Sequence, residues 1–259
     1  QEQLDRIVHP FMLRRTKEKV LDELPEKTEI YQTVELSSEE MAVYEIIRER
    51  AQQLLEAENS EKVSINALAE ITRLRQASCS AQLVEKTWKG KSSKIEALIE
   101  ALEPIVESGD AALVFSQFTS FLAIVRKELE KAGIPYLYID GTISVKERQK
   151  LVDQFQGGKC PVFVISLKAG GLGLNLTRAN YVFHLDPWWN PAIEQQATDR
   201  THRIGQHNAV TVYHFLSSGT IEEKIKRLHE QKRDLAENIL EGTDMSGKIT
   251  GKELLEMIK

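Results

Sequence analysis

The chain has 259 residues, of which 41% are hydrophobic and 28% charged, and its net charge is −5. This composition is typical of a globular protein with a sizeable core, and no stretch approaches the roughly 18 apolar residues that a membrane span needs. The cysteines, Cys79 and Cys160, are isolated, which excludes a disulfide framework and a cysteine-based zinc site. An acidic balance argues against nucleic-acid binding, but residues 109–217 carry 11 basic and 9 acidic side chains.

The start of the chain contains no basic-then-apolar leader of the kind that directs secretion. We therefore expect a reducing intracellular compartment: the cytoplasm or nucleoid of a prokaryote, or the nucleus of a eukaryote. We expect no membrane partner. Because the chain begins at Gln1 rather than Met, we also expect a fragment of a longer protein.

Helical patterns dominate the first hundred residues. Ser37, Ser38, Glu39 and Glu40 have the N-cap and acidic first turn of a helix that should extend to about residue 57. Apolar residues at helical spacing predict two more helices. They should cover residues 65–74 and 95–102, the second stopping before Pro104.

The middle of the chain alternates short apolar runs with amphipathic stretches. Each run has the length of a buried strand. The runs are 112–115, 136–139, 162–165, 181–185 and 210–216. Helices are expected over 121–129 and 146–155, with Thr119 and Ser144 as caps. This alternation predicts an α/β fold, with a parallel sheet that carries helices on both faces.

The last part of the chain again reads as helical. Thr220 should cap a long helix to about residue 240, followed by a loop over 242–251 and a short tail helix.

Ligands of parallel sheets bind at the carboxyl ends of the strands, so the loops after the predicted strands are the first candidates for a site. The run at 166–175 contains Gly170, Gly171 and Gly173, which could expose N–H groups to an anion. A tight strand-to-loop turn would explain the same glycines. Ser116 and Gln117 end another strand, where they could bond to phosphate oxygens.

The sharpest pattern lies between residues 190 and 206. Asn190 and Pro191 open a helix, and Gln196, Arg200 and Arg203 follow at i, i+4 and i+7. This spacing predicts that the three side chains share one helical face. Two guanidiniums at one place suit a polyphosphate. The alternative is a solvated face whose arginines pair with a nearby carboxylate, Glu194 or Asp199.

Two adjacent tryptophans, Trp188 and Trp189, stand just before this helix. Both cannot easily be buried in a loop, so one is expected to pack while the other stacks on a base or enters a groove. No P-loop, and no acidic pair after a buried strand, is visible in the sequence. The chain is therefore expected to lack a nucleotide cradle of its own. The histidines have no ligand-like spacing, so we expect no metal site.

These motifs resemble the C-terminal half of Swi/Snf-family ATP-dependent DNA translocases, within helicase superfamily two. Residues 166–206 (SLKAGGLGLNLTRANYVFHLDPWWNPAIEQQATDRTHRIGQ) are similar to motifs five and six of that family. Residues 112–119 (ALVFSQFT) resemble motif four, residues 136–155 the adjoining block, and residues 9–29 the segment that joins the two lobes. One stretch departs from the family: RLRQ at 73–76 is followed by ASCSAQ, without the usual His-Pro pair.

The resemblance implies a RecA-like lobe that closes over ATP held by a first lobe, which is absent here and would hold most of the Mg²⁺ ligands. The expected parts are an inter-lobe connector (1–30), an N-terminal helical insertion (31–91), the RecA-like lobe (92–217) and a C-terminal helical extension (218–259).

The resemblance also implies roles for single residues. The arginine fingers would be Arg200 and Arg203, with Gln196 as their catalytic partner. The residues assigned to the ATP site are Gly171, Gly173 and Asp199. Those assigned to DNA are Ser116, Gln117, Ser166, Lys168, Trp189 and Asn190.

The implied function is the second motor lobe of an ATP-dependent translocase on double-stranded DNA, inactive on its own. Its expected partners are duplex DNA and the first lobe of the same polypeptide. Two alternatives are a strand-separating helicase lobe of the same superfamily and a non-catalytic RecA-like scaffold. The physiological substrate is left open.

Overall fold

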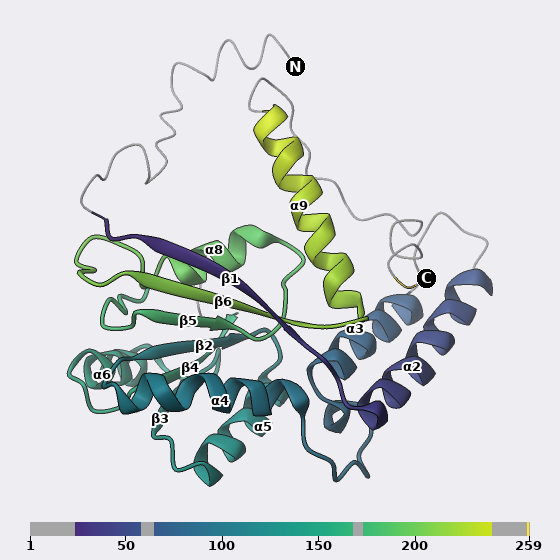
Figure 1. The fold of residues 1–259 in the computed structure, drawn as a ribbon, viewed down its shortest axis with the longest axis horizontal. Helices are drawn as coiled ribbons and strands as arrows, with labels where there is room; N and C mark the ends of the chain where they lie inside the picture. The colour runs from purple at the N-terminus through teal and green to yellow at the C-terminus, as the bar shows by residue number, and fades with distance from the viewer. Residues whose placement is uncertain (1–23, 58–64, 168–172, 240–257, 259) are drawn as a thin grey trace.

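The computed structural model describes residues 24–57, 65–167, 173–239 and 258. Six parallel strands form one sheet in the order β1-β6-β5-β2-β4-β3 (Figure 1). All five predicted strands are present, and the predicted parallel α/β class is confirmed. They are β2 (Ala112–Ser116), β3 (Tyr136–Ile139), β4 (Val162–Ser166), β5 (Tyr181–His184) and β6 (Val210–Ser217).

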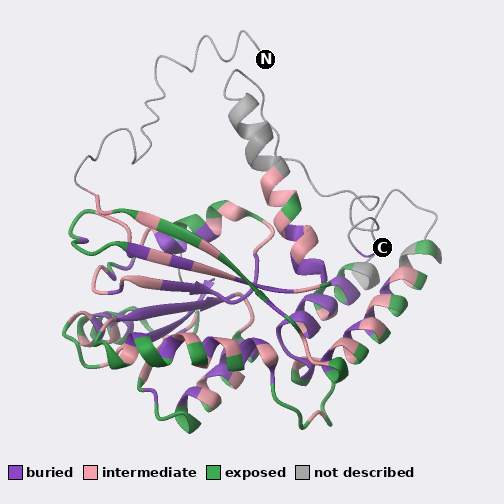
Figure 2. Cartoon of the chain, viewed as in Figure 1, coloured by how far each residue is buried: buried purple, intermediate pink, exposed green. Residues whose placement is uncertain are grey.

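Alternate residues of the central strands supply two cores, one on each face of the sheet. Val114 of β2 packs in a core with α4 (Ser93–Glu107) and α5 (Thr119–Lys131). Its neighbour Phe115 packs in the other core, with α6 (Val145–Gln156) and α8 (Pro191–Thr198). This follows from the two-residue period of a strand. Figure 2 shows the central strands buried along their length, with helices on both sides.

The edge strand β1 (Lys27–Val34) was not predicted from the sequence. It pairs with β6 from Lys27 opposite Val210 to Val34 opposite Ser217. Only Val34 in this strand is buried, so the apolar run that marks a central strand is missing. The strand crosses residue 30, where we expected the connector to end.

Three helices form a separate unit beyond the carboxyl ends of β1 and β6 (Figure 1). We call it the helical unit: α2 (Ser38–Ala57), α3 (Ile65–Cys79) and α9 (Ile221–Ile239). Residues of all three helices share a third core, which includes Tyr44, Leu74 and Ile225. A short 3-10 turn, η3 (Ala81–Leu83), follows α3. These helices confirm three of the predicted ones, whereas the expected loop 242–251 lies outside the described residues.

Capping explains where several helices begin. Ser37 and Glu40 form a reciprocal capping box: Glu40 N donates to Ser37 Oγ at 3.2 Å, and Ser37 N donates to Glu40 Oε2 at 3.1 Å. Ser144 caps α6 as predicted, since its side chain accepts from Glu147 N.

Two of the predicted helix boundaries are wrong. The helix α4 does not stop before Pro104 but continues to Glu107, because Leu102 and Ile105 keep its buried face across the proline. Pro104 itself is exposed. The cap of α5 is Phe118 rather than Thr119, because Phe118 N bonds to Ser116 Oγ at 3.1 Å and Phe118 stays extended.

A buried ion pair joins the helical unit to the sheet. Lys94 Nζ of α4 lies 2.6 Å from Glu222 Oε2 of α9, and both side chains are at most 1% exposed. Ser217 N at the end of β6 donates to the same carboxylate at 2.8 Å. Burial raises the pKa of Glu222, and the attraction to Lys94 opposes that rise.

No helix of the described residues is long and apolar enough to cross a membrane.

Candidate functional site

The helix that carries the arginine motif is shorter than the spacing predicted. Asn190 caps α8 by accepting from Ala192 N at 3.1 Å, but the helix ends at Thr198, with Asp199 as its C-cap. Arg200 N then bonds to Ala197 O, three residues back rather than four. The prediction that Gln196, Arg200 and Arg203 share one helical face is therefore wrong, since the helix ends before both arginines, with Arg200 in a turn and Arg203 in a bend.

The two arginines nevertheless remain electrostatic neighbours. Burial lowers the pKa of Arg200, Arg203 lowers it further, and Asp199 opposes both effects. Arg200 Nε is buried and has no hydrogen-bond partner among the described residues. Asp199 accepts a bond from Gln195 Nε2 at 3.0 Å, and Gln196 is exposed. Two adjacent cations with an unsatisfied buried donor suit an anionic ligand.

Hydrogen bonds from the backbone and from one side chain hold this arginine turn against the residues that follow the glycine-rich loop. Leu176 N donates to Arg200 O at 3.0 Å. Gln206 Nε2 donates to Thr177 O at 3.0 Å and to Ala179 O at 2.8 Å. The fold thus places residues 176–179, which follow the glycine-rich loop, beside the arginine turn. Gln206, which fixes this contact, was not among the predicted site residues.

The predicted residues of the glycine-rich loop fall into three groups. Gly173 is exposed and has φ of +70°, a conformation that favours glycine. Ser166, the last residue of β4, is 1% exposed, and its Oγ has no partner within the described part of the chain. Lys168 and Gly171 lie outside the described residues.

The predicted DNA-binding residues at the end of β2 and just after it already take part in hydrogen bonds within the protein. Ser116 is fully buried, and its Oγ accepts from Phe118 N. The side-chain amide of Gln117 donates to Asp186, and Gln117 N donates to Asp186 Oδ1 at 3.3 Å. A DNA contact by either side chain would have to replace these bonds.

The two adjacent tryptophans are both partly exposed and pack in different directions. Trp188 packs against the core that contains Phe115, and Trp189 packs against the core of the helical unit. The Arg75 guanidinium lies over the Trp189 ring, 4.7 Å from its centroid. Asn190 is exposed, which leaves the end of this loop open to solvent.

A row of stacked rings crosses the sheet beside this loop. Neighbouring rings stand at paired positions of four adjacent strands, with centroids 4.9–5.5 Å apart. The row is Phe115, His184, His214 and Tyr31. The sequence could not reveal it, because the row depends on which strands are neighbours and in what register.

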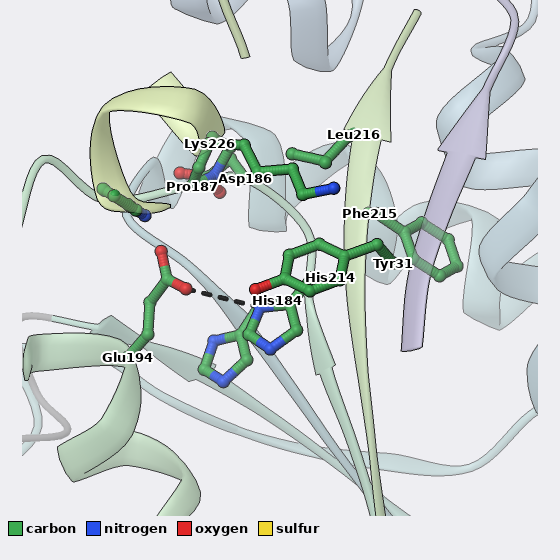
Figure 3. A pocket seen from close by; sticks show the side chains of 10 residues that line it. Tyr31, His184, Asp186, Pro187, Glu194, His214, Phe215, Leu216 and Lys226 are labelled. Carbon is green, nitrogen blue, oxygen red and sulfur yellow. Dashed lines mark ion pairs between the residues drawn. The ribbon is translucent and has the colours of Figure 1, made fainter. Parts of the chain in front are cut away.

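Glu194 connects this row to the tryptophan loop. Its Oε2 lies 3.4 Å from His214 Nδ1, the ion pair drawn as a dashed line in Figure 3, and its Oε1 accepts from Trp188 N at 2.6 Å. Glu194 is buried; burial raises its pKa, but the bond to His214 and the charge of His184 outweigh this, and the net shift is downward. Glu194 thus fixes the loop before α8 to strand β6.

Protonation of His184 should make the stability depend on pH. Burial, helped by His214, lowers the pKa of His184 to about 4, and His184 Nε2 lies 3.0 Å from Thr198 Oγ1. Between pH 6.5 and 4 the unfolded chain binds a proton there that the folded chain does not, so stability is lost as pH falls. We expect this residue to account for a loss of about 3 kcal/mol by pH 4.

Urea unfolding of wild type and His184→Phe at several pH values between 7.5 and 4 tests this expectation. The variant should show a shallower dependence of unfolding free energy on pH, whatever its absolute stability. Equal slopes for the two proteins would contradict the assignment.

Comparisons with known proteins identify the family. Residues 93–205 match the helicase conserved C-terminal domain, and residues 1–83 match the SNF2-related domain. The structure is similar to the C-terminal domain of the Sulfolobus solfataricus SWI2/SNF2 ATPase, with a TM-score of 0.67 and 30% identity. That match covers 83% of this chain and 90% of the other.

The chain belongs to the SWI2/SNF2 ATPase family. The core of the same Sulfolobus solfataricus SWI2/SNF2 ATPase, solved in complex with double-stranded DNA, gives a TM-score of 0.73 at 33% identity. That match covers 99% of this chain and 55% of the Sulfolobus solfataricus core. The RecA-like fold expected from the sequence is therefore confirmed.

Longer relatives in this SWI2/SNF2 group come from bacteria and eukaryotes. An uncharacterized ATP-dependent helicase of Mycoplasma pneumoniae is 38% identical, over 96% of this chain and 24% of that protein. The DNA repair protein RAD5A of Arabidopsis thaliana is 41% identical, over 68% of this chain and 17% of its own length. The chain spans about a quarter of the curated relatives that it matches over nearly its whole length.

Proposed function

We propose that this chain is the second motor lobe of an intracellular ATP-dependent translocase on double-stranded DNA. The observation that carries the proposal is the pair Arg200 and Arg203, which are electrostatic neighbours and include a buried Nε without a partner in the described part of the chain. Such a pair is suited to an anion supplied from outside the lobe. The family to which the chain belongs consists of ATPases, and its relatives include ATP-dependent helicases.

In this proposal a first lobe binds ATP and most of the Mg²⁺ ligands, and the second lobe closes on the γ-phosphoryl group. Arg200 and Arg203 neutralise the charge that develops during phosphoryl transfer. Asp199 offsets part of the repulsion between Arg200 and Arg203. Gln196, which is exposed, acts as their partner once the lobes close. Gly171 and Gly173 line the cleft, where the absence of side chains permits a close approach of the backbone.

The DNA partner is proposed from the related core that was solved with duplex DNA. Trp189 and Asn190 approach the groove, and Ser166 and Lys168 contact a phosphate. Ser116 and Gln117 contact the backbone of the tracked strand, a role that requires rearrangement of their present bonds. A few placed donors suit a motor that must slide, because each further ion contact adds salt-sensitive affinity.

Trp189→Ala should uncouple ATP hydrolysis from movement along DNA in a protein that joins this lobe to a first lobe. We expect base pairs moved per ATP to fall about fivefold or more, since an aromatic contact with nucleic acid contributes roughly 1–3 kcal/mol. Movement is measured by displacement of a triplex-forming strand from duplex DNA, and hydrolysis by phosphate release in the same reaction. Unchanged movement per ATP would refute the role of Trp189 at the groove.

The alternative of a strand-separating helicase is distinguished by the substrate. The translocase proposal predicts displacement of a triplex-forming strand from a blunt duplex, without separation of blunt or tailed duplex strands. Efficient separation of a tailed duplex would favour the helicase. A non-catalytic scaffold would have no use for the arginine pair and would displace neither.

A further inference from the structure

Arg75 of α3 lies between two loops that follow strands β2 and β5. Its side chain is 5% exposed, and its Nη2 donates to Pro187 O at 2.6 Å. The guanidinium stands between two aromatic rings, 4.7 Å from the centroid of Trp189 and 5.6 Å from that of Phe118. One side chain of the helical unit therefore touches both loops.

A buried carboxylate, Asp186, lies close enough to Arg75 for the two charges to influence each other. Asp186 is 2% exposed and accepts bonds from Gln117 N and the Gln117 side-chain amide. Burial raises the pKa of Asp186, and hydrogen bonding to Ser116, attraction to Arg75 and the bond from Gln117 oppose that rise. Burial lowers the pKa of Arg75, and Asp186 is the largest influence in the other direction. Each charge therefore offsets part of the cost of burying the other.

The neighbouring arginine of the same motif behaves differently. Arg73 is partly exposed and pairs with Glu70 on its own helix at 3.4 Å. The RLRQ motif at 73–76 thus contains one surface arginine and one that reaches the loops of the sheet. An arginine suits the second position, because a planar guanidinium can stack against an aromatic ring while its edge donates to a carbonyl, a geometry that a compact ammonium lacks.

We propose that Arg75 is a positioning residue that fixes Trp189 and Gln117 relative to each other, so that a grip on DNA by one loop is transmitted to the other. The contact also ties both loops to α3, so the helical unit helps to set their geometry. This inference rests on the proposed function, because it assigns Arg75 a role in coupling DNA movement to hydrolysis.

The test uses Arg75→Lys in a protein that joins this lobe to a first lobe, with Arg73→Lys as a control that makes the same change on the same helix. We expect Arg75→Lys to lower base pairs moved per ATP about threefold, because lysine keeps the positive charge and loses the stacked guanidinium. Arg73→Lys should leave that ratio unchanged. A protein that is merely less stable loses hydrolysis and movement in proportion, so its ratio stays constant.

Two further variants make the result specific. Phe118→Leu removes one ring and keeps both buried charges, so it should lower the ratio in the same way without depending on the folding of the lysine variant. Arg75→Lys added to Trp189→Ala should cause no further loss, because both changes act on the same contact.

The outcomes separate this inference from the proposed function. A normal ratio in Arg75→Lys and in Phe118→Leu, beside a lowered ratio in Trp189→Ala, overturns the role of Arg75 and leaves the translocase standing. Additive losses in the double variant also overturn it. A wild-type protein that hydrolyses ATP but displaces no triplex strand overturns the proposed function, and the inference with it.

Discussion

Arg203→Ala should lower DNA-stimulated ATP hydrolysis by about 10³-fold or more in a protein that joins this lobe to a first lobe, within the range found for arginine fingers. The guanidinium supplies positive charge where negative charge develops, and alanine removes that part of the compensation. Steady-state phosphate release at saturating DNA measures the loss. DNA binding, followed by fluorescence anisotropy, should remain nearly intact, because Arg203 faces the nucleotide in this account.

A matched control is Arg126→Ala on α5. Its guanidinium lies over the ring of Tyr138, 4.2 Å from the centroid and away from the arginine turn. This control should keep hydrolysis close to that of wild type. Normal turnover in Arg203→Ala would remove the finger assignment, whereas loss of DNA binding together with hydrolysis would place Arg203 on the DNA instead.

Lys94→Met should destabilise the chain by about 3–5 kcal/mol, the usual effect of removing one partner from a buried ion pair. The Glu222 carboxylate is at most 1% exposed, and the substitution removes its cation while Ser217 N still bonds to it. Since the pair joins α4 to α9, the helical unit should loosen from the sheet. Urea unfolding at pH 7 measures the change.

The double variant Lys94→Met with Glu222→Gln separates charge from packing. It removes the stranded charge and keeps an acceptor for Ser217 N, so it should recover most of the lost stability. A double variant as unstable as the single one would show that the shape of the lysine, rather than its charge, matters at this position. A loss below about 1 kcal/mol in the single variant would contradict the burial of the pair.

The buried strands could be predicted because each is a short apolar run, and the fold follows from their alternation with helices. The strand β1 could not be predicted in the same way. Its residues are largely exposed, and its position depends on pairing with β6, about 180 residues further along the chain. Pro104 led to the prediction of a helix end that the structure does not show. The burial of one face of α4 outweighs the loss of the one backbone donor that proline lacks.

The part of the candidate site whose residues lie close together in sequence could be predicted. The contacts between residues that only the fold brings together could not. Helical spacing suggested the arginine pair, and the pair is present, but the helix ends before it. The contact of Arg75 with Pro187 spans 112 positions. Its place between Trp189 and Phe118 depends on the order of β2 and β5, which the sequence does not show.

The most direct test of the central claim is ATP hydrolysis by this chain alone, compared with the same chain joined to a first lobe. The account predicts no DNA-stimulated hydrolysis by the 259 residues on their own, because the described residues offer an arginine pair for ATP and its cradle is expected in the other lobe. Joined to the first lobe, the chain should hydrolyse ATP when duplex DNA is added. Robust hydrolysis by the 259 residues alone would contradict the account.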